Sequence, residues 1–545
     1  MKSTRRQFLG YTATLTAAAS ASWLIHRHLN PMPGIKVNRV GLPLGHLLRD
    51  GALLQTPAQT YHCDTLILGS GAAALSALWY LEKNGHRNIL LAEGFERNGN
   101  NAGYYTGQKL GAPTGAHYLA LPSRESVYVR EMLADLGIIE GFNQAGKPVY
   151  RETDLVYAPQ ERLLYQGKWQ EHLIPKDDAD TRRFFGFIRQ IKTARGSDGR
   201  KLFAIPIVLS SADENWRHLD RLTFAQWLTQ QKYRSLTLLW YLDYCCRDDY
   251  GQGIAQVSAF AGLHYFAARG NEDDAVLTWA DGLAHLSEAL RTHTKLQPLP
   301  RLPDTPTMVF PQPVSFDASA VKIKETEHHA EVWLRHNQSG ETLAVYAKRV
   351  ISAMPLMVAA RILEQAADYG FQTGLSEYAP WLVANFVMRR FPQETGGSEL
   401  AWDNVVYGSK GLGYVVATNQ FIRTAKPAET VFTTYHALNH DTPQRIRQWL
   451  LEASDQTLLD YAAKELTAAY GKRVLNHVKH ADITVRGHGM SVPQPGYLNR
   501  PLLHALRSHR SRIVFAHSDL SGYSVFEEAA YWGVEAAKSI LEMPV

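Results

Sequence analysis

The chain has 545 residues, of which 45% are hydrophobic and 20% are charged. This composition is that of a soluble globular protein with room for two domains, and it excludes a disordered chain. The net charge is +5, but Lys2, Arg5, Arg6 and Arg27 lie in residues 1–30, which have no acidic residue. The rest of the chain is therefore nearly neutral, which gives no support to a nucleic-acid partner.

Residues 1–30 resemble a twin-arginine export signal. Arg5 and Arg6 precede an apolar, Ala- and Thr-rich run that ends at Ile25. This pattern predicts a periplasmic protein carried by the twin-arginine export machinery, which accepts folded proteins and so suits one that loads a cofactor first. The small-x-small residues 19–21 could be a cleavage site, while the apolar run up to Ile25 leaves an uncleaved membrane anchor as the alternative.

Cysteine usage agrees with folding before export. The chain contains three cysteines, Cys63, Cys245 and Cys246. The last two are adjacent, and a disulfide between neighbours would be strained. No disulfide framework, no C-x-x-C pair and no haem attachment motif is present. A cytochrome partner would therefore be a separate protein.

A dinucleotide fingerprint begins at residue 65. Residues 65–68 form a short apolar run that predicts a buried strand, and residues 69–74 read G-x-G-x-x-A before a helix that reaches Lys83. The first glycine of such a motif permits the turn, the second lets the backbone approach a pyrophosphate, and the alanine allows close helix packing. The helix N-terminus then offers N–H groups to the phosphates.

A second strand is predicted at residues 88–92 and ends at Glu93. Glu93 follows Gly69 by 24 residues, near the ~20 expected for a carboxylate that binds a ribose hydroxyl. Strand, glycines, helix, strand and acid in this order predict a Rossmann-like domain.

Later segments resemble the FAD-dependent amine oxidase-like superfamily. They are a glycine-rich stretch at 94–107, the Gly115-Ala116 pair, residues 277–290, the strand leading into A-x-P at 350–355, and the strand, acid and helix at 512–540. The chain departs from the family pattern in two places. Residues 98–101 replace the usual Gly-Gly-Arg, and His517 replaces a glycine.

The resemblance implies an α/β fold in which a Rossmann-like FAD-binding domain is interleaved with an α+β substrate-binding domain. The first would comprise residues 58–125, 272–370 and 475–545, and the second residues 126–271 and 371–474. FAD would be non-covalent, since residues 487–496 lack a cysteine. Val314 is a rival to Val321 as the adenine contact. The implied cofactor-binding residues are Gly69, Gly71, Ala72, Ala73, Ala74, Glu93, Gly115, Ala116, Val321, Asp519, Ser521 and Gly522.

Two residues are implied in catalysis, Tyr523 and Asn385. Tyr523 matches one wall of the family's aromatic cage, whereas the second wall falls at Gly489, which has no ring. Asn385 falls where many relatives place a lysine beside the flavin, and no lysine lies between Lys348 and Lys410. The missing lysine favours a dehydrogenase that uses a quinone or cytochrome as electron acceptor over an oxidase that uses oxygen.

Several other motifs leave two interpretations open. The acidic pair at 248–249 and residues 272–274 could hold a cationic amine, but the pattern favours a solvated loop or a helix cap. Residues 402–414 could line a pocket or form a strand pair in the substrate sheet. His488 is a candidate flavin neighbour or a structural histidine. Histidines 328–329 lack metal-ligand spacing, so no metal site is expected.

The sequence therefore predicts an exported FAD-dependent oxidoreductase that oxidises a small-molecule amine, such as a polyamine or an amino acid, by hydride transfer to the flavin. One alternative is an FAD-dependent desaturase or porphyrinogen-type oxidoreductase, which would act on very apolar substrates. The other is a non-enzymatic flavin-binding assembly factor, which would have a blocked flavin face.

Overall fold

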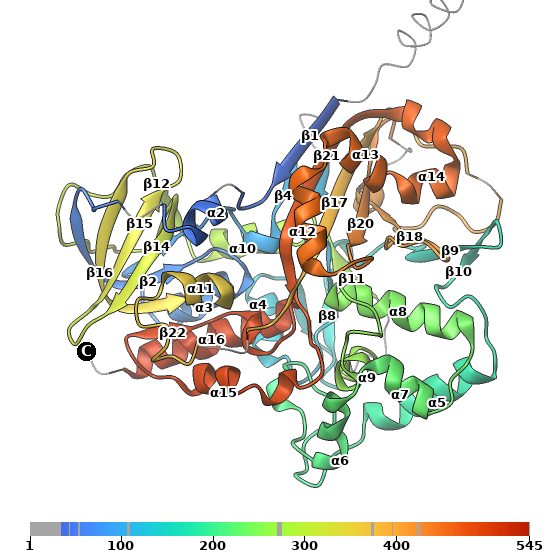
Figure 1. The fold of residues 1–545 in the computed structure, drawn as a ribbon, viewed down its shortest axis with the longest axis horizontal. Coiled ribbons are helices and arrows are strands. Elements are labelled where there is room, and N and C mark those ends of the chain that lie inside the picture. The colour runs from blue at the N-terminus through green and yellow to red at the C-terminus, as the bar shows by residue number, and fades with distance from the viewer. Residues whose placement is uncertain are drawn as a thin grey trace, which may run out of the picture.

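The computed structural model describes residues 34–42, 44–52, 55–105, 110–269, 275–371, 375–394, 396–421, 425 and 427–543. The predicted export signal and the acidic residues 272–274 lie outside this part of the chain. Two eight-stranded sheets organise the described residues, with a group of helices below the second (Figure 1). Within these ranges, no helix combines the length and the hydropathy needed to cross a bilayer.

The first sheet has the strand order β12-β13-β3-β2-β16-β15-β14, with β22 also paired to β16. Strands β12, β13, β3, β2, β16 and β22 run parallel, whereas β14 and β15 form an antiparallel hairpin with β16. Their bounds are β2 (Thr60–Leu68), β3 (Ile89–Ala92), β12 (Gln297–Leu299), β13 (Val314–Phe316), β14 (Ala318–Glu325), β15 (Ala330–His336), β16 (Thr342–Ser352) and β22 (Ile513–Phe515).

The register of these parallel strands brings their carboxyl ends to one line. Leu68 pairs with both Ala92 and Ser352, and Ser352 pairs with Phe515. The segments that follow β2, β3, β16 and β22 therefore leave the sheet side by side, which is where α/β sheets bind ligands. The predicted strands at 65–68, 88–92, 350–352 and 512–516 all form part of this arrangement.

Helices cover both faces of the first sheet, because successive side chains of a strand point to opposite sides. Leu66 and Leu68 pack with α11 (Leu356–Ile362), α15 (Pro501–Ser508) and the hairpin side. Ile67 packs on the other face with four helices. These are α3 (Ala72–Lys83), α4 (Val127–Asp135), α10 (Ala284–His293) and α16 (Phe526–Glu542).

The second sheet has the order β1-β21-β17-β20-β19-β18-β9-β10. Along β17, Leu382 and Phe386 pack under three helices, and Trp381 and Val383 face the interior of the molecule. The bounds are β1 (Gly34–Arg39), β9 (Glu161–Tyr165), β10 (Lys168–Glu171), β17 (Tyr378–Met388), β18 (Asp403–Val406), β19 (Tyr414–Val416), β20 (Thr430–Ala437), β21 (Val478–Ser491), α12 (Pro443–Glu452), α13 (Asp455–Ala462) and α14 (Lys464–Tyr470).

The sequence assigned residues from 475 onward to the cofactor domain, but β21 is a central strand of the second sheet. The cofactor domain therefore resumes only after Ser491. Residues 402–414 form a strand pair, β18 with β19, and Trp402 and Tyr414 within it are buried.

A third core lies among helices α5 (Ala179–Lys192), α6 (Glu214–Arg217), α7 (Phe224–Gln230), α8 (Leu236–Tyr250) and α9 (Ala259–Ala267). Cys245 and Cys246 on α8 are buried and free, as is Cys63. The remaining elements are short: α2 (Leu44–Arg49), β4 (Gly103–Tyr105), β5 (Gly111–Pro113), β6 (Tyr118–Ala120), β7 (Ile139–Phe142), β8 (Pro148–Tyr150) and β11 (Val276–Thr278).

The contact between α3 and α16 generates the first prediction. A Cβ at Gly533 of α16 would overlap the carbonyl oxygen of Ala73 and lie 3.1 Å from the amide of Ala77. Alanine normally favours a helix over glycine by about 1 kcal/mol, but here overpacking, which typically costs about 1–3 kcal/mol, opposes that gain. We expect Gly533→Ala to lower the midpoint of urea unfolding.

The matched control is Gly186→Ala in α5, where the nearest atom to a new Cβ is the flexible end of Arg189 at 3.8 Å. This variant should be as stable as the wild type or more stable. Equal effects at both positions would contradict the proposed close approach of the two helices.

Candidate functional site

A cavity of about 990 Å³ lies at the line where the parallel strands of the first sheet end, and both sheets contribute to its wall. Residues 69–73, which are the turn after β2 and the first two residues of α3, line it. Gly69 has φ +107°, and a Cβ there would lie 3.1 Å from the carbonyl oxygen of Ala353. The turn therefore requires glycine for its own geometry.

Gly71 is needed for a different reason. It precedes α3 as the N-cap residue, and no side chain caps the helix. A Cβ on Gly71 would meet nothing nearer than the carbonyl oxygen of Asn98 at 4.0 Å. The protein thus leaves room at this position, so a side chain would intrude on whatever occupies the cavity. Exposed N–H groups at a helix start form an anion site, and they fit the pyrophosphate of a dinucleotide.

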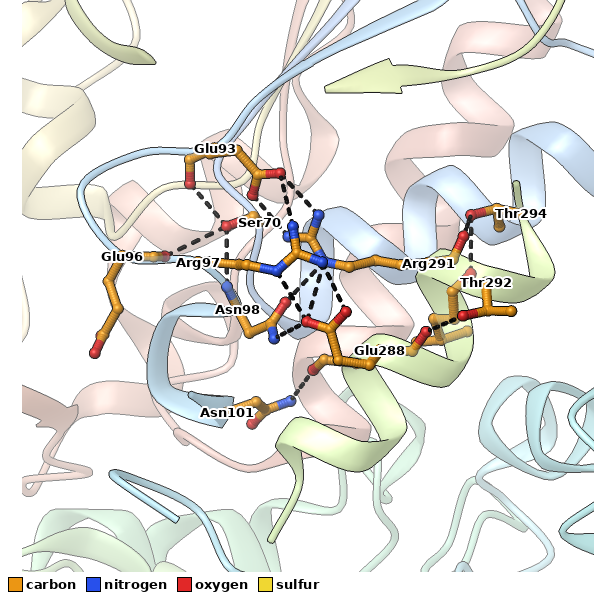
Figure 2. Close-up of polar contacts among 12 residues, drawn as sticks. Ser70, Glu93, Glu96, Arg97, Asn98, Asn101, Glu288, Arg291, Thr292 and Thr294 are labelled. Atoms are coloured by element: carbon orange, nitrogen blue, oxygen red, sulfur yellow. Dashed lines mark hydrogen bonds and ion pairs between the residues drawn. The ribbon is translucent and has the colours of Figure 1, made fainter. Parts of the chain in front are cut away.

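Glu93 lines the cavity just beyond β3 and forms a buried ion pair with Arg291 of α10 (Figure 2). Arg291 Nη1 and Nη2 donate to the two carboxylate oxygens at 2.8 and 2.6 Å. Burial alone would raise the pKa of Glu93, but the hydrogen bonds and charge of Arg291 outweigh it, so the pKa lies below its ordinary value. Glu93 is therefore an ionised, fixed acceptor, as binding a ribose hydroxyl requires.

The turn at residues 98–101, which replaces the family's Gly-Gly-Arg, is held by side chains of α10 (Figure 2). Asn98 Oδ1 accepts from Arg291 Nε at 2.8 Å, and Asn98 Nδ2 donates to Glu288 at 2.8 Å. Asn101 Nδ2 donates to Ser287 Oγ at 3.3 Å. In place of the arginine of the Gly-Gly-Arg pattern, the chain thus has a hydrogen-bond network that holds the backbone of residues 98–101 in position.

Arg486 of β21 is the arginine in this part of the wall, but its guanidinium is already engaged. It donates to Glu96 at 2.7 Å, to Asn100 Oδ1 at 3.1 Å and to the carbonyl oxygen of Thr114 at 3.1 Å. Arg486 therefore joins the second sheet to the loops of the first. It also fixes the Gly115-Ala116 pair, which lines the cavity.

Asp519, which follows β22, supplies a second buried acceptor. Its Oδ2 accepts from the amide of Leu356 at 2.9 Å and from the hydroxyl of Tyr378 at 2.5 Å, while Oδ1 has no hydrogen-bond partner among the described residues. Burial would raise the pKa of Asp519, but His517 and these hydrogen bonds keep it below its ordinary value. An unpartnered carboxylate oxygen in the cavity wall fits a ligand hydroxyl.

The structure brings most of the predicted cofactor residues together. Those that line the cavity are Gly69, Gly71, Ala72, Ala73, Glu93, Gly115, Ala116 and Asp519. Those that do not are Ala74, Val321, Ser521 and Gly522. Val321 is buried at a bulge in β14, and Ser319 and Ala320 reach the cavity in its place.

The remaining three residues have packing roles. Ala74 is buried between helix and strand, Ser521 Oγ donates to Glu528, and a Cβ on Gly522 would overlap the ring of Tyr497. The contacts of Ser521 and Gly522 shape the segment that follows Asp519. None of the three residues lines the cavity.

The two residues predicted for catalysis also lie outside the cavity wall. Asn385 shares a face of β17 with Trp381 and Val383, which do line the cavity. However, Pro113 of β5 covers Asn385, and the Pro113 carbonyl oxygen accepts a hydrogen bond from Asn385 Nδ2 at 2.8 Å. Tyr523 is 1% exposed, accepts a hydrogen bond from the hydroxyl of Tyr497, and packs against His264. Direct contact of either side chain with a bound substrate is not supported.

One end of the cavity, the acidic arm, is lined by Asp248, Asp249, Glu527, Arg269, Tyr118 and Tyr435. The sequence pattern favoured a solvated loop or a helix cap for residues 248–249, but they occupy the last turn of α8 in the cavity wall, where Asp249 is buried and Asp248 is half-buried. Tyr118 Oη donates to Asp248 Oδ2 at 3.0 Å, and Arg269 pairs with Asp249 at 2.9 Å. Burial, reinforced by Asp249, raises the pKa of Asp248 to about 7.

Aromatic rings complete the acidic arm. His117 stacks on Tyr435 with centroids 4.3 Å apart, and Trp402 lies 5.5 Å from the same imidazole. Burial lowers the pKa of His117 to about 3, so the ring is neutral. A neutral aromatic wall beside carboxylates suits an organic cation. No sequence motif connects the residues of this arm, since they lie in or beside β6, α8, α9, β18, β20 and α16.

The other end, the basic arm, is lined by His46 and Arg49 of α2, Arg361 of α11, Arg447 of α12 and His488 of β21. Burial, with Arg447 and His46 nearby, lowers the pKa of His488 to about 4, so the imidazole is neutral. Of this set the sequence indicated only His488. The others are scattered over some 400 residues with no common motif.

No protein-family model matches the chain, and no curated protein matches it. Among solved structures, a putrescine oxidase double mutant is 15% identical over 89% of this chain and 100% of its own, with a TM-score of 0.60. Cyclohexylamine oxidase from Brevibacterium oxydans is 16% identical over 88% and 99%, with a TM-score of 0.55. A fatty acid isomerase from P. acnes is 14% identical over 87% and 97%, with a TM-score of 0.53. The predicted α/β fold is thereby confirmed, since the chain shares it with these solved structures.

The ion pair of Glu93 with Arg291 generates the second prediction. In Arg291→Met the carboxylate stays buried without its partner, which typically costs about 3–5 kcal/mol. We expect the midpoint of urea unfolding to fall strongly at pH 7. The loss should shrink below the ordinary pKa of glutamate, 4.5, because the stranded carboxylate can then be protonated.

Arg182→Met is the control, since Arg182 is 63% exposed and pairs with the exposed Asp177. Such a surface pair contributes at most about 1 kcal/mol. A loss in Arg291→Met that is no larger than in Arg182→Met, or that does not change with pH, would contradict the assigned role of the pair.

Proposed function

We propose that the protein is an FAD-dependent oxidoreductase that removes a hydride equivalent from an amine. The observation that carries the proposal is the acidic arm, which opens into the same cavity as the dinucleotide-binding turn. A cofactor and a cationic substrate would therefore meet in one enclosed space. The fold is shared with putrescine oxidase and cyclohexylamine oxidase, whose substrates are amines.

The residues of the cavity wall fit FAD. The N–H groups at the start of α3 would hold the pyrophosphate, and Glu93 would accept a hydrogen bond from the adenosine ribose. The free Oδ1 of Asp519 would accept from a hydroxyl of the ribityl chain. When bound, FAD supplies the electron-pair acceptor that no side chain provides. The cofactor would be non-covalent, as the sequence predicts.

The acidic arm would bind the amine as a cation. Among the described residues, Asp249 forms an ion pair with Arg269, whereas Asp248 and Glu527 form none. Tyr118 occupies Oδ2 of Asp248, which leaves Oδ1 for an ammonium group. Because the pKa of Asp248 is about 7, this carboxylate can also take the ammonium proton, and the amine must be neutral before hydride leaves its carbon.

The same charges disfavour the alternatives. A very apolar substrate would leave the buried carboxylates without a partner, at a large cost, and a fatty acid anion would be repelled by them. A flavin-binding assembly factor would have a blocked cofactor face, whereas this cavity has about 990 Å³ of space.

We further propose a dehydrogenase that acts in the periplasm. Among the described lining residues there is no lysine, the residue that the related oxidases place beside the flavin. The twin arginines at positions 5 and 6 support export. Retention of the signal as an anchor is the alternative to its cleavage.

Cofactor binding is tested by Gly71→Val. The new side chain would enter the cavity at the phosphate position, so purified variant should contain less than a tenth of the wild-type FAD. Gly141→Val is the control, because Gly141 lies in a surface hairpin with no atom within 4 Å of a new Cβ. FAD content would be read from the absorbance of released flavin. Full occupancy in the Gly71 variant would overturn the assignment of the cavity.

Amine recognition is tested by anaerobic titration of the holoenzyme with putrescine, spermidine and aryl amines. One class should bleach the oxidised flavin, and Asp248→Asn should weaken that binding about 10- to 100-fold, the value of a hydrogen bond to a charged group. Wild-type affinity should fall as the pH drops through about 7, because Asp248 becomes neutral. The variant should lack this pH dependence.

Asp177→Asn, at a 72% exposed carboxylate, is the control and should behave as the wild type. Bleaching by no amine would disprove the proposed reaction. Bleaching that Asp248→Asn leaves unchanged would remove the acidic arm from substrate binding.

A further inference from the structure

The amine oxidation proposed above does not involve the basic arm. It is the part of the cavity between α2, α11 and α12, on the side where β21 carries His488. Its charge is opposite to that of the acidic arm, yet both belong to one cavity. A site with two oppositely charged ends suits two different substrates of the same cofactor.

The polar groups of the basic arm have donors to spare. Arg447 Nη1 donates to the carbonyl oxygen of Tyr378 at 3.1 Å and forms no ion pair with a described residue. Arg361 is exposed and has neither a hydrogen bond nor an ion pair within the described chain. His488 lines the cavity, and its neutral ring keeps one N–H to donate. These groups can donate to carbonyl oxygens and stabilise negative charge on them.

The walls between these groups are apolar. Leu375 is 36% exposed and Leu451 is 42% exposed, although both lie in the cavity wall. The other apolar residues that line this arm are Leu42, Leu48, Met357, Val358 and Leu450. Arg49 pairs with Asp50, but Arg361 and Arg447 form no ion pair within the described chain. Exposed leucines beside these two arginines indicate a pocket for a ligand that is mainly apolar and carries hydrogen-bond acceptors.

We propose that the basic arm binds a quinone, which is the electron acceptor of the enzyme. This inference rests on the proposed function, because it concerns the second half of the same catalytic cycle. The quinone gains two electrons and two protons from the reduced cofactor and solvent and leaves as quinol, while the cofactor returns to its oxidised form. Negative charge grows on the quinone oxygens as electrons arrive, and Arg447 and His488 would stabilise it.

A quinone fits this arm better than the other acceptors. Oxygen needs no pocket of this size or polarity. A cytochrome would exchange electrons across a surface and would not enter between helices. A flat apolar ring with two carbonyl oxygens matches apolar walls that end in a guanidinium and an imidazole.

The test follows the oxidative half-reaction alone. Holoenzyme is reduced with one equivalent of dithionite under anaerobic conditions and mixed with a short-chain ubiquinone analogue. We expect the oxidised flavin absorbance to return at a rate that saturates with quinone concentration. Arg447→Met should slow this return at least 10-fold, whereas its rate with oxygen and its reduction by amine should match the wild type.

Arg445→Met is the matched control. It lies on the same helix, is 77% exposed and does not line the cavity, so it should reoxidise at the wild-type rate. A second readout needs no electron transfer. A redox-inert hydroxyquinoline N-oxide should quench the fluorescence of oxidised holoenzyme in a saturable manner, and its affinity should fall in Arg447→Met but not in Arg445→Met.

Each other outcome overturns the inference. A linear, unsaturable dependence on quinone, equal rates in both variants, or reoxidation by soluble cytochrome c but not by quinone would show that the basic arm is not a quinone site. Dithionite bypasses the amine, so these results do not depend on amine oxidation. Failure of every amine to bleach the flavin, with normal quinone kinetics, would instead disprove the proposed substrate.

Discussion

The site depends on one constraint, the shared register of the parallel strands β2, β3, β16 and β22. Because Leu68 pairs with both Ala92 and Ser352, the turns that follow these strands leave the sheet at one level. The start of α3, the carboxylate of Glu93 and the carboxylate of Asp519 are thereby placed along one wall, although they are separated by up to 450 residues. A shift of one residue in any strand would turn its side chains to the other face and break this line.

The cavity has an acidic arm and a basic arm, and this separation of charge lowers the stability of the fold. The cost in stability indicates that the two arms have a function. Buried carboxylates without enough partners raise their own pKa values, as Asp248 shows, and unpaired guanidinium groups lose hydration without a compensating bond. Packing the same space with apolar residues would be more stable. Both arms are therefore best explained as binding sites. The carboxylates of the acidic arm would pair with a bound cation, and the arginines of the basic arm would donate to an apolar molecule that carries hydrogen-bond acceptors.

The sequence predicted the parts of the site that lie in short local patterns. The turn at 69–74, the strand ending at Glu93 and the acid at 519 are each recognisable because turn, strand and helix signals surround them. Asp248 and Arg447 could not be assigned, since a helical residue faces a cavity only through tertiary packing that no local pattern records. Asn385 was implied by its position in the family pattern, and that pattern does not record Pro113, which covers the side chain. The boundary at 475 failed because β21, although it adjoins the cofactor elements in sequence, pairs with β17.

The way in which the two sheets meet also connects cofactor binding to folding. Arg486 of β21 reaches Glu96 and the loop before Gly115, so the second sheet holds two loops of the first. The cavity wall is complete only when both sheets are docked, and a ligand that bridges them binds the folded state alone. Such a ligand stabilises the fold by mass action, by about 2.7 kcal/mol at a hundred times its dissociation constant. A protein built in this way gains stability by loading its cofactor, which is what the proposed export of a folded chain would require.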